Sequence, residues 1–337
     1  MRKLPPLSEA LKSIKEYGKT DKLTGIKDVD LLILKELSDK DLFQMCLVNK
    51  SVNRACKDEY FWRERFLKTF SNSQELLKYK KEGETWRQYY LKFIYYTSEY
   101  NAKPHLIRQA SFDGDLSLVV YAALKDPNSI HTLGDLPLQL ANQGGYYDIM
   151  KFLISKGSIV NVNNGTILIW NCAHGTFDIV KFLVEHGADI HSQEDAPIRW
   201  AAKGNKIDMV KYLIEKGANI HPKNEEVLRW FSKKGDVEMV KYLIGQGAIP
   251  NPESRAVEEA INGGHLNLVQ YFLENGFDTE YNLDNNYLMK VAVNSFSLPV
   301  VKYLVGRGYP VTSEIIEEAK KKGYIQIVDF LKTKMKQ

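Results

Sequence analysis

Apolar residues recur along most of the chain with the spacing of a helix face. In the stretch DIVKFLVEHGADI, which begins at Asp178, the apolar positions within residues 179–184 follow i, i+1, i+4 and i+5, and these cover one side of a helix. Asp178 lies in the first turn, where the helix dipole favours a negative charge, and Gly187 follows the last turn, where a left-handed residue closes the helix. The pattern predicts a short amphipathic helix that ends at the glycine.

The same run returns about every 30 residues. Its copies start at Ile149, Ile179, Met209, Met239, Leu268, Val300 and Ile327, and a degenerate copy starts at Leu118. A shorter helix is predicted before each run, and in one copy it opens near Pro197, because proline is tolerated in a first helical turn. Since two short helices cannot bury an apolar face alone, neighbouring copies must stack into one continuous core. The expected fold is all-α, a solenoid of short helical hairpins.

The repeated segments resemble ankyrin repeats. The likeness is carried by GADI at 187–190, GANI at 217–220, APIRWAA at 196–202 and GGHLNLVQYFL at 263–273. The resemblance implies an ankyrin array of about seven or eight copies over residues 104–333, with a short tail at 334–337. The usual ankyrin period is about 33 residues, and here about three residues are missing between the GADI segment and the next helix, so shortened fingers are expected.

Tryptophan returns at one position of three consecutive copies, as Trp170, Trp200 and Trp230. Leu140 stands one copy earlier and Glu259 one copy later, so the row is expected to end there. One interpretation is that the three indoles fill space left by the shortened fingers. The other is an aromatic strip on the groove of the array, since tryptophan is enriched among binding hot spots. The sequence leaves both open.

The residues just before the glycine between the two helices of each copy vary from copy to copy. They are Ala173 and His174, Lys203 and Gly204, Lys233 and Lys234, Asn262 and Gly263, and Lys321 and Lys322. In ankyrin-like proteins these positions line the groove. The candidate partner-binding residues of the groove are the three tryptophans with His174, Lys203, Lys233, Lys234 and Asn262.

Residues 23–70 do not share the period and predict three or four short helices. The spacing of Ile33-Leu34, Leu37, Asp41-Leu42, Val48, Lys50 and the segment from Asp58 to Trp62 resembles an F-box. This small domain belongs to a family that implies binding to a Skp-type adaptor. The candidate adaptor-binding residues are Leu31, Leu34, Leu37, Leu42, Val48 and Trp62. The Leu-Pro pair that opens the family pattern is absent from LTGIKDVD at 23–30. The alternative is a bundle that only shields the first repeat.

Residues 1–22 are expected to form an N-terminal extension, and residues 71–103 a linker with a docking helix. The aromatic run ETWRQYYLKFIYYTSEY at 84–100 would join the helical domain to the repeats. An F-box-like start followed by short ankyrin copies resembles the ankyrin proteins of giant viruses of the mimivirus group. Bacterial effectors that imitate host proteins use the same pairing.

Composition and motifs argue for a folded binding protein. With 44% apolar and 26% charged residues, the chain has no stretch near the ~20 apolar residues of a membrane span, and its start does not resemble a secretory signal. A net charge of +4 with scattered lysines makes nucleic acid an unfavoured partner. Cys46, Cys56 and Cys172 lack CxxC spacing and are expected to be reduced, buried thiols.

No phosphate loop, GxGxxG, HExxH or GxSxG pattern is present, so neither an enzyme nor a cofactor is expected. His191 and His221 repeat with the scaffold but have no Cys or Asp set that would predict a metal site.

The sequence therefore predicts a non-enzymatic interaction scaffold. The F-box resemblance implies that it couples a host or viral client on the groove to a cullin-RING ubiquitin ligase of the SCF type, through a Skp-type adaptor. The expected location is the host cytoplasm, with the nucleus as an alternative. Two other functions stay open: a module that sequesters a host protein without ubiquitin, and a structural protein packed in a virion.

Overall fold

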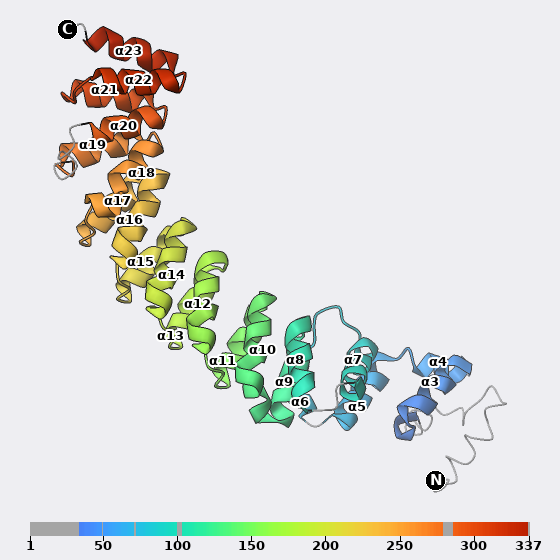
Figure 1. The fold of residues 1–337 in the computed structure, drawn as a ribbon. Helices are drawn as coiled ribbons and strands as arrows, with labels where there is room; N and C mark the ends of the chain where they lie inside the picture. The colour runs from blue at the N-terminus through green and yellow to red at the C-terminus, as the bar shows by residue number, and fades with distance from the viewer. Residues whose placement is uncertain (1–33, 49, 71, 100–102, 279–285, 336–337) are drawn as a thin grey trace, which may run out of the picture. The chain divides into compact units, whose positions relative to one another are not determined.

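The computed structural model describes residues 34–48, 50–70, 72–99, 103–278 and 286–335 (Figure 1). Within these residues the regular elements are all helices, and no strand occurs. The predicted all-α repeat architecture is confirmed. The chain divides into two compact units, Met1–Ser158 and Ile159–Gln337.

The first unit contains the N-terminal helices and the start of the repeats. Its elements are α3 (Asp39–Val48), α4 (Lys50–Ala55), α5 (Glu59–Thr69), α6 (Ser73–Leu76), η1 (Leu77–Tyr79), α7 (Trp86–Glu99), α8 (Lys103–Asp113), α9 (Leu116–Lys125), η2 (Pro127–His131), α10 (Thr132–Gln143) and α11 (Tyr147–Ser155). Capping residues set several of these starts. The Asp58 carboxylate accepts from the backbone N–H of Tyr60 at 2.8 Å and opens α5, as an N-cap aspartate should.

A buried arginine ties the N-terminal segment to α5. Arg65 is only 5% exposed, and its Nη2 donates to the backbone oxygen of Leu37 at 2.7 Å. The same nitrogen lies 2.7 Å from Oδ1 of Asp39, the first residue of α3, and Nη1 donates to the oxygen of Leu34 at 3.1 Å. Charge-assisted bonds of this kind are the strong ones, and together they satisfy a guanidinium that would be costly to bury alone. Arg65 therefore fixes how residues 34–39 lie on α5.

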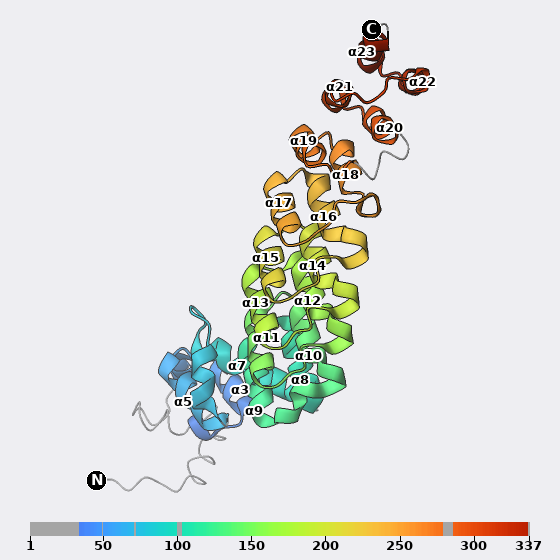
Figure 2. The ribbon, with the colours of Figure 1, turned by 90° about the vertical axis from the view of Figure 1, so that its left-hand side faces the viewer.

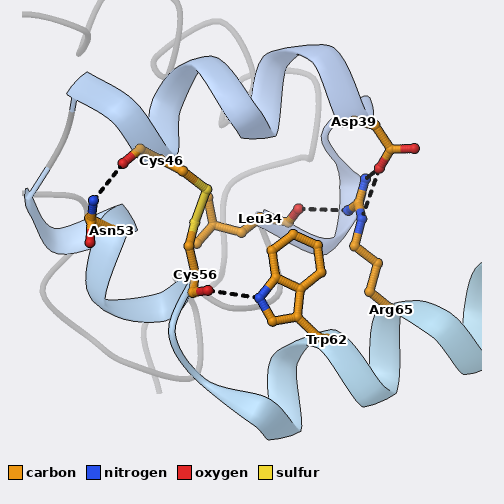
Figure 3. Close-up of a disulfide and its surroundings, with 7 residues drawn as sticks. All are labelled: Leu34, Asp39, Cys46, Asn53, Cys56, Trp62 and Arg65. Carbon is orange, nitrogen blue, oxygen red and sulfur yellow. Dashed lines mark hydrogen bonds and ion pairs between the residues drawn. A yellow bond between two sulfur atoms is a disulfide. The ribbon is translucent and has the colours of Figure 1, made fainter. Parts of the chain in front are cut away.

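The structure joins Cys46 of α3 and Cys56, which follows α4, in a disulfide (Figure 3). This corrects the expectation of reduced thiols. The two cysteines are ten positions apart in the sequence, and the packing of α3 against α4 brings their Cα atoms to 6.2 Å, within the range that a disulfide spans. The bond lies beside Trp62, whose indole N–H donates to the backbone oxygen of Cys56 at 2.8 Å. Cys172 keeps a buried free thiol, and burial raises its pKa to about 12.

Helix α7 packs against both the N-terminal helices and the first repeat. On one side Phe93 and Tyr89 lie against Phe66 of α5. On the other, Phe93 contacts Tyr121 of α9 edge-on, with 5.4 Å between ring centroids. The Lys92 ammonium lies 2.9 Å from the carboxylate of Asp115, the N-cap of α9. Aromatic packing and one ion pair thus hold these parts of the first unit together.

The described residues of the second unit form a row of six helical hairpins. Its elements are α12 (Val162–His174), α13 (Phe177–Glu185), α14 (Ser192–Lys203), α15 (Ile207–Glu215), α16 (Pro222–Lys234), α17 (Val237–Gly245), η3 (Pro252–Ser254), α18 (Ala256–Asn262), α19 (Leu266–Glu274), α20 (Tyr287–Asn294), α21 (Leu298–Gly306), α22 (Ser313–Lys321) and α23 (Ile325–Met335). Even-numbered helices stack on one another in one layer, and odd-numbered helices form the other (Figure 2). The core lies between the layers, where residues such as Leu213 and Phe231 are fully buried.

The predicted helix stops are present as left-handed glycines. Gly187, Gly217 and Gly247 have φ of 85°, 94° and 110°, values that suit glycine because it lacks a Cβ. The following backbone N–H closes each turn, as when Ala188 donates to the oxygen of Leu183 at 3.0 Å.

The shortened fingers contain a feature that the sequence did not reveal. Gln193, Glu194 and Asp195 have φ of 51°, 58° and 57°, so they form a left-handed turn before the right-handed part of α14, which begins at Ala196. Three other first helices open in the same way, at residues 133–135, 163–165 and 223–225. Left-handed non-glycine residues cost roughly 1–2 kcal/mol each, so stacked neighbours must hold these turns in place.

Because the Cys46–Cys56 bond closes a short loop, we expect it to stabilise the N-terminal helices by about 2–3 kcal/mol. In the double variant Cys46→Ser/Cys56→Ser, the N-terminal helices should unfold at a lower urea concentration than in the unmodified chain. Cys172→Ser removes no disulfide and should leave the unfolding of these helices unchanged. Fluorescence of the buried Trp62 and thiol titration measure the two effects. One reactive thiol is expected in the denatured, unreduced chain; three would contradict the bond.

Candidate protein-interaction surface

The three predicted tryptophans lie at one register of three successive first helices, Trp170 on α12, Trp200 on α14 and Trp230 on α16. Trp170 is 49% exposed and Trp200 is 40% exposed, while Trp230 is half-buried. On α14 the core side is formed by Ile198 and Ala201, both fully buried, and Trp200 projects from the other side. Of the two interpretations left open, the structure supports surface positions for Trp170 and Trp200.

Cationic side chains lie over the indoles. The Lys203 ammonium is 4.4 Å from the ring centroid of Trp200, one turn earlier on α14, and 5.7 Å from that of Trp230 on the next helix. Lys233 lies 5.6 Å above Trp230. A cation over a ring face is attracted by about 0.5–1 kcal/mol at exposed sites. The two lysines are exposed, and they hold positive charge beside the aromatic surface.

At the first tryptophan an imidazole lies against the ring, from one position later in the repeat than Lys203 and Lys233. The His174 ring stacks on Trp170 with 4.0 Å between centroids and 29° between planes. We call these six residues the tryptophan–lysine strip: Trp170, His174, Trp200, Lys203, Trp230 and Lys233. Lys234 is exposed beside its end, at the last residue of α16. The structure thus brings together most of the predicted groove residues.

Glu226 on α16 lies beside the strip, and its carboxylate already has partners. Its carboxylate pairs with Arg199 and accepts from the indole N–H of Trp230 at 3.2 Å. Burial alone would raise the pKa of Glu226, but the bonds from Arg199 and Trp230 and the charges of Arg199 and Arg229 outweigh it and hold the pKa below its ordinary value. Glu226 stays ionised and positions Arg199 and Trp230.

The strip ends where the sequence indicated. Glu259 on α18 stands at the tryptophan register of the next copy and is half-buried. Asn262, also a predicted groove residue, is exposed at the last position of α18 but is an uncharged amide. Within the described repeats, lysine lies over tryptophan on α14 and α16, and histidine stacks on tryptophan on α12.

The predicted adaptor-binding residues have a different setting. Leu34, Leu42 and Trp62 are fully buried and Leu37 is 9% exposed, so these side chains form the core of the N-terminal helices. Side chains without exposed surface cannot touch a partner, and any part they take in adaptor binding would be to shape the surface around them. Leu31 and the side chain of Val48 lie outside the described residues. Adaptor binding stays a prediction.

Sequence reasoning missed a shallow pocket between α8 and α10 in the first unit. It has a volume of about 320 Å³ and is lined by His105, Arg108, Gln109, Phe112, Leu136 and Leu140. Phe112 is 61% exposed there. When the copies are aligned on their second helices, Phe112 stands at the position of Lys203 and Gln109 at that of Trp200. This alignment could have identified both as candidate groove residues from the sequence. The pocket combines apolar side chains with an arginine.

The repeated histidines have a structural partner within their own turns. Nδ1 of His191 lies 2.7 Å from Oδ1 of Asp195, and that of His131 lies 3.0 Å from Oδ1 of Asp135. His221 pairs with Glu225 in the same way. Each pair bridges the left-handed turn at the start of a first helix. Within the described part of the chain, no three His, Cys, Asp or Glu side chains form a group that could hold a metal ion.

Family models match two kinds of segment in the chain, a repeat region and an N-terminal domain. A family model described as ankyrin repeats (3 copies) matches residues 106–194, and one described as ankyrin repeats (many copies) matches residues 198–244. A model of the F-box domain matches residues 31–64. No curated protein matched the chain. In the described residues, no helix is long and apolar enough to cross a membrane.

If Trp200 belongs to the surface, its removal should hardly affect folding. We expect Trp200→Ala to lower the free energy of unfolding by about 1 kcal/mol or less, because the side chain is partly exposed. Phe231→Ala, which empties a fully buried site on α16, should cost about 3–5 kcal/mol. Urea unfolding followed by circular dichroism compares the two variants. Equal losses would place Trp200 in the core.

Proposed function

We propose that this chain, which carries ankyrin repeats and an N-terminal F-box domain, recruits a client protein to a cullin-RING ubiquitin ligase. Both domain types are protein-interaction modules, and their presence on one chain makes it a protein-interaction adaptor. Each of the two domain types is proposed to bind a different partner. The F-box domain would bind a Skp-type adaptor, and the first helices of the repeats would hold the client.

The observation that carries the proposal is that the F-box match coincides with helices that form their own core. Residues 31–64 include α3 and α4, which the disulfide links, and the start of α5, which Arg65 ties to residues 34–39. Helix α7 then packs this domain against α9. A client bound to the repeats and a partner bound to the domain would be held together by one polypeptide chain, and a ligase must be held near its client in this way to transfer ubiquitin to it.

The combination of domains also supports a proposal for where the chain acts. A cullin-RING ligase is reached in the cytoplasm or nucleus of a eukaryotic cell, so the cytoplasm is the proposed location. If the chain is viral, as its resemblance to giant-virus ankyrin proteins suggests, the ligase would be the host's and the client a host or viral protein.

A second function is favoured by one feature of the sequence. The Leu-Pro pair of the F-box pattern is absent from residues 23–30. A chain that had lost adaptor binding would act as a module that sequesters its client without ubiquitin. The two functions share the repeat surface and differ only in whether the N-terminal domain has a partner.

The test uses the intact chain with a purified Skp-type adaptor and cullin. We expect a stable complex in gel filtration, and we expect the double variant Leu34→Asp/Leu42→Asp to lose it. Two carboxylates placed at fully buried positions would cost several kcal/mol and disrupt the small domain. Trp200→Ala should keep the complex, because it lies on the repeats.

Circular dichroism controls for the repeats, which should stay helical in both variants. The intact chain and both variants are also incubated with host lysate, and captured proteins are identified by mass spectrometry. The recruitment proposal expects the leucine variant to lose the adaptor but keep its client. A client captured by an intact chain that binds no adaptor would favour sequestration instead.

A further inference from the structure

The tryptophan–lysine strip exposes apolar surface that no described residue of the second unit covers. Trp170 and Trp200 keep 49% and 40% of their surface exposed although fully buried positions adjoin them on the same helices. Contiguous exposed apolar surface rimmed by polar groups marks interaction sites in folded proteins. Tryptophan is also among the residues most enriched at binding hot spots.

The charge of the strip is uncompensated. Among the residues that the structure describes, no carboxylate forms an ion pair with Lys203, Lys233 or Lys234. Other lysines of the same repeats do have such partners: Lys223 lies 3.2 Å from Glu194 and Lys241 lies 3.3 Å from Glu238. Glu226, which accepts from the indole N–H of Trp230, is paired with Arg199. Three cations beside exposed indoles therefore have no acidic partner within the described chain.

We infer that this strip binds an acidic polypeptide segment that also carries apolar side chains. This inference rests on the proposed function, in which the repeats hold a client, and it specifies the chemistry of that client. Carboxylates of the segment would pair with Lys203, Lys233 and Lys234. Its apolar side chains would pack on the exposed parts of the indoles.

The packing around the rings favours a polypeptide over single-stranded nucleic acid. Nucleic acid binds such surfaces by stacking bases on open aromatic faces. Here His174 already stacks on Trp170 at 4.0 Å, and Lys203 lies 4.4 Å from the centroid of Trp200. One face of each ring is thus occupied, and the remaining surface suits aliphatic and aromatic side chains.

The extent of the strip sets the length of the segment. Stacked helices lie about 8–10 Å apart, so the two steps from Trp170 to Trp230 cover roughly 20 Å. An extended segment rises about 3.3 Å per residue and would cross the strip with about six residues. Beyond the strip, Glu259 presents a carboxylate at the same register, which would repel further acidic residues.

The experiment titrates the intact chain with three synthetic probes. The first is a peptide of about ten residues in which Glu alternates with Phe or Leu, long enough to span the strip. The second is the same peptide with Lys in place of Glu, and the third is an oligo-dT of similar length. Calorimetry measures affinity, and the fluorescence of the exposed tryptophans reports binding at the strip.

The acidic peptide should bind, and the double variant Lys203→Glu/Lys233→Glu should weaken it at least about tenfold, because each lost charge pair removes favourable interaction with the peptide. Trp200→Ala should weaken it by a similar factor. The matched control is Lys216→Glu/Lys241→Glu, which makes the same change in net charge on α17 and at the end of α15. The control should stay within about twofold of the unmodified chain.

Several outcomes would overturn the inference. They are absence of binding by the acidic peptide at millimolar concentration, equal weakening by the control, and preference for the lysine peptide. Tighter binding of oligo-dT that the strip variants abolish would identify a nucleic-acid surface instead. The result is separable from the proposed function, since the adaptor complex is measured independently. A chain that binds the adaptor but not the peptide would keep the proposed function and exclude only this client chemistry.

Discussion

The structure depends on one constraint, which is that a hairpin of two short helices cannot bury its apolar face without a neighbour. Each first helix of the second unit packs on the next, and each second helix closes the other side of the same core. Leu213 and Phe231 lose all their exposed surface only because adjoining copies are in place. The constraint also supports local strain, since the left-handed turns at residues 193–195 and 223–225 exist within stacked neighbours that hold them.

Stacking in register also creates the candidate interaction surface. Once the core positions of each first helix are fixed, every position outside the core also has a fixed place on its helix. The same position on successive copies therefore lies in a line along the array. Trp170, Trp200 and Trp230 become a row for this reason, and Lys203 can lie over indoles of two consecutive helices. The core determines where the row lies, but it leaves the identity of each side chain free. That freedom allows three copies to carry indoles and cations while the next carries Glu259.

The period of the apolar pattern was sufficient to predict the repeated hairpins and their glycine stops, because those features follow from local spacing. It could not decide whether the tryptophans are exposed, which depends on packing between copies. The Cys46–Cys56 bond could not be predicted for a related reason: the pair has no CxxC spacing, and the packing of two helices brings the cysteines together. The left-handed turns also escaped prediction, since residues such as Gln193 and Glu194 do not ordinarily adopt positive φ.

The N-terminal domain solves the burial problem by other means. It has too few helices for stacking to supply a large core, and it uses a covalent bond between α3 and α4, a buried Arg65 and an aromatic cluster around Phe66. Leu34, Leu42 and Trp62 are fully buried in that core. Any adaptor could therefore contact only the surface around them. The two kinds of segment therefore differ in how sequence relates to binding. In the repeats, an exposed residue such as Trp200 can change without loss of the fold. In the small domain, the residues of the family pattern are largely the buried ones that stabilise the domain.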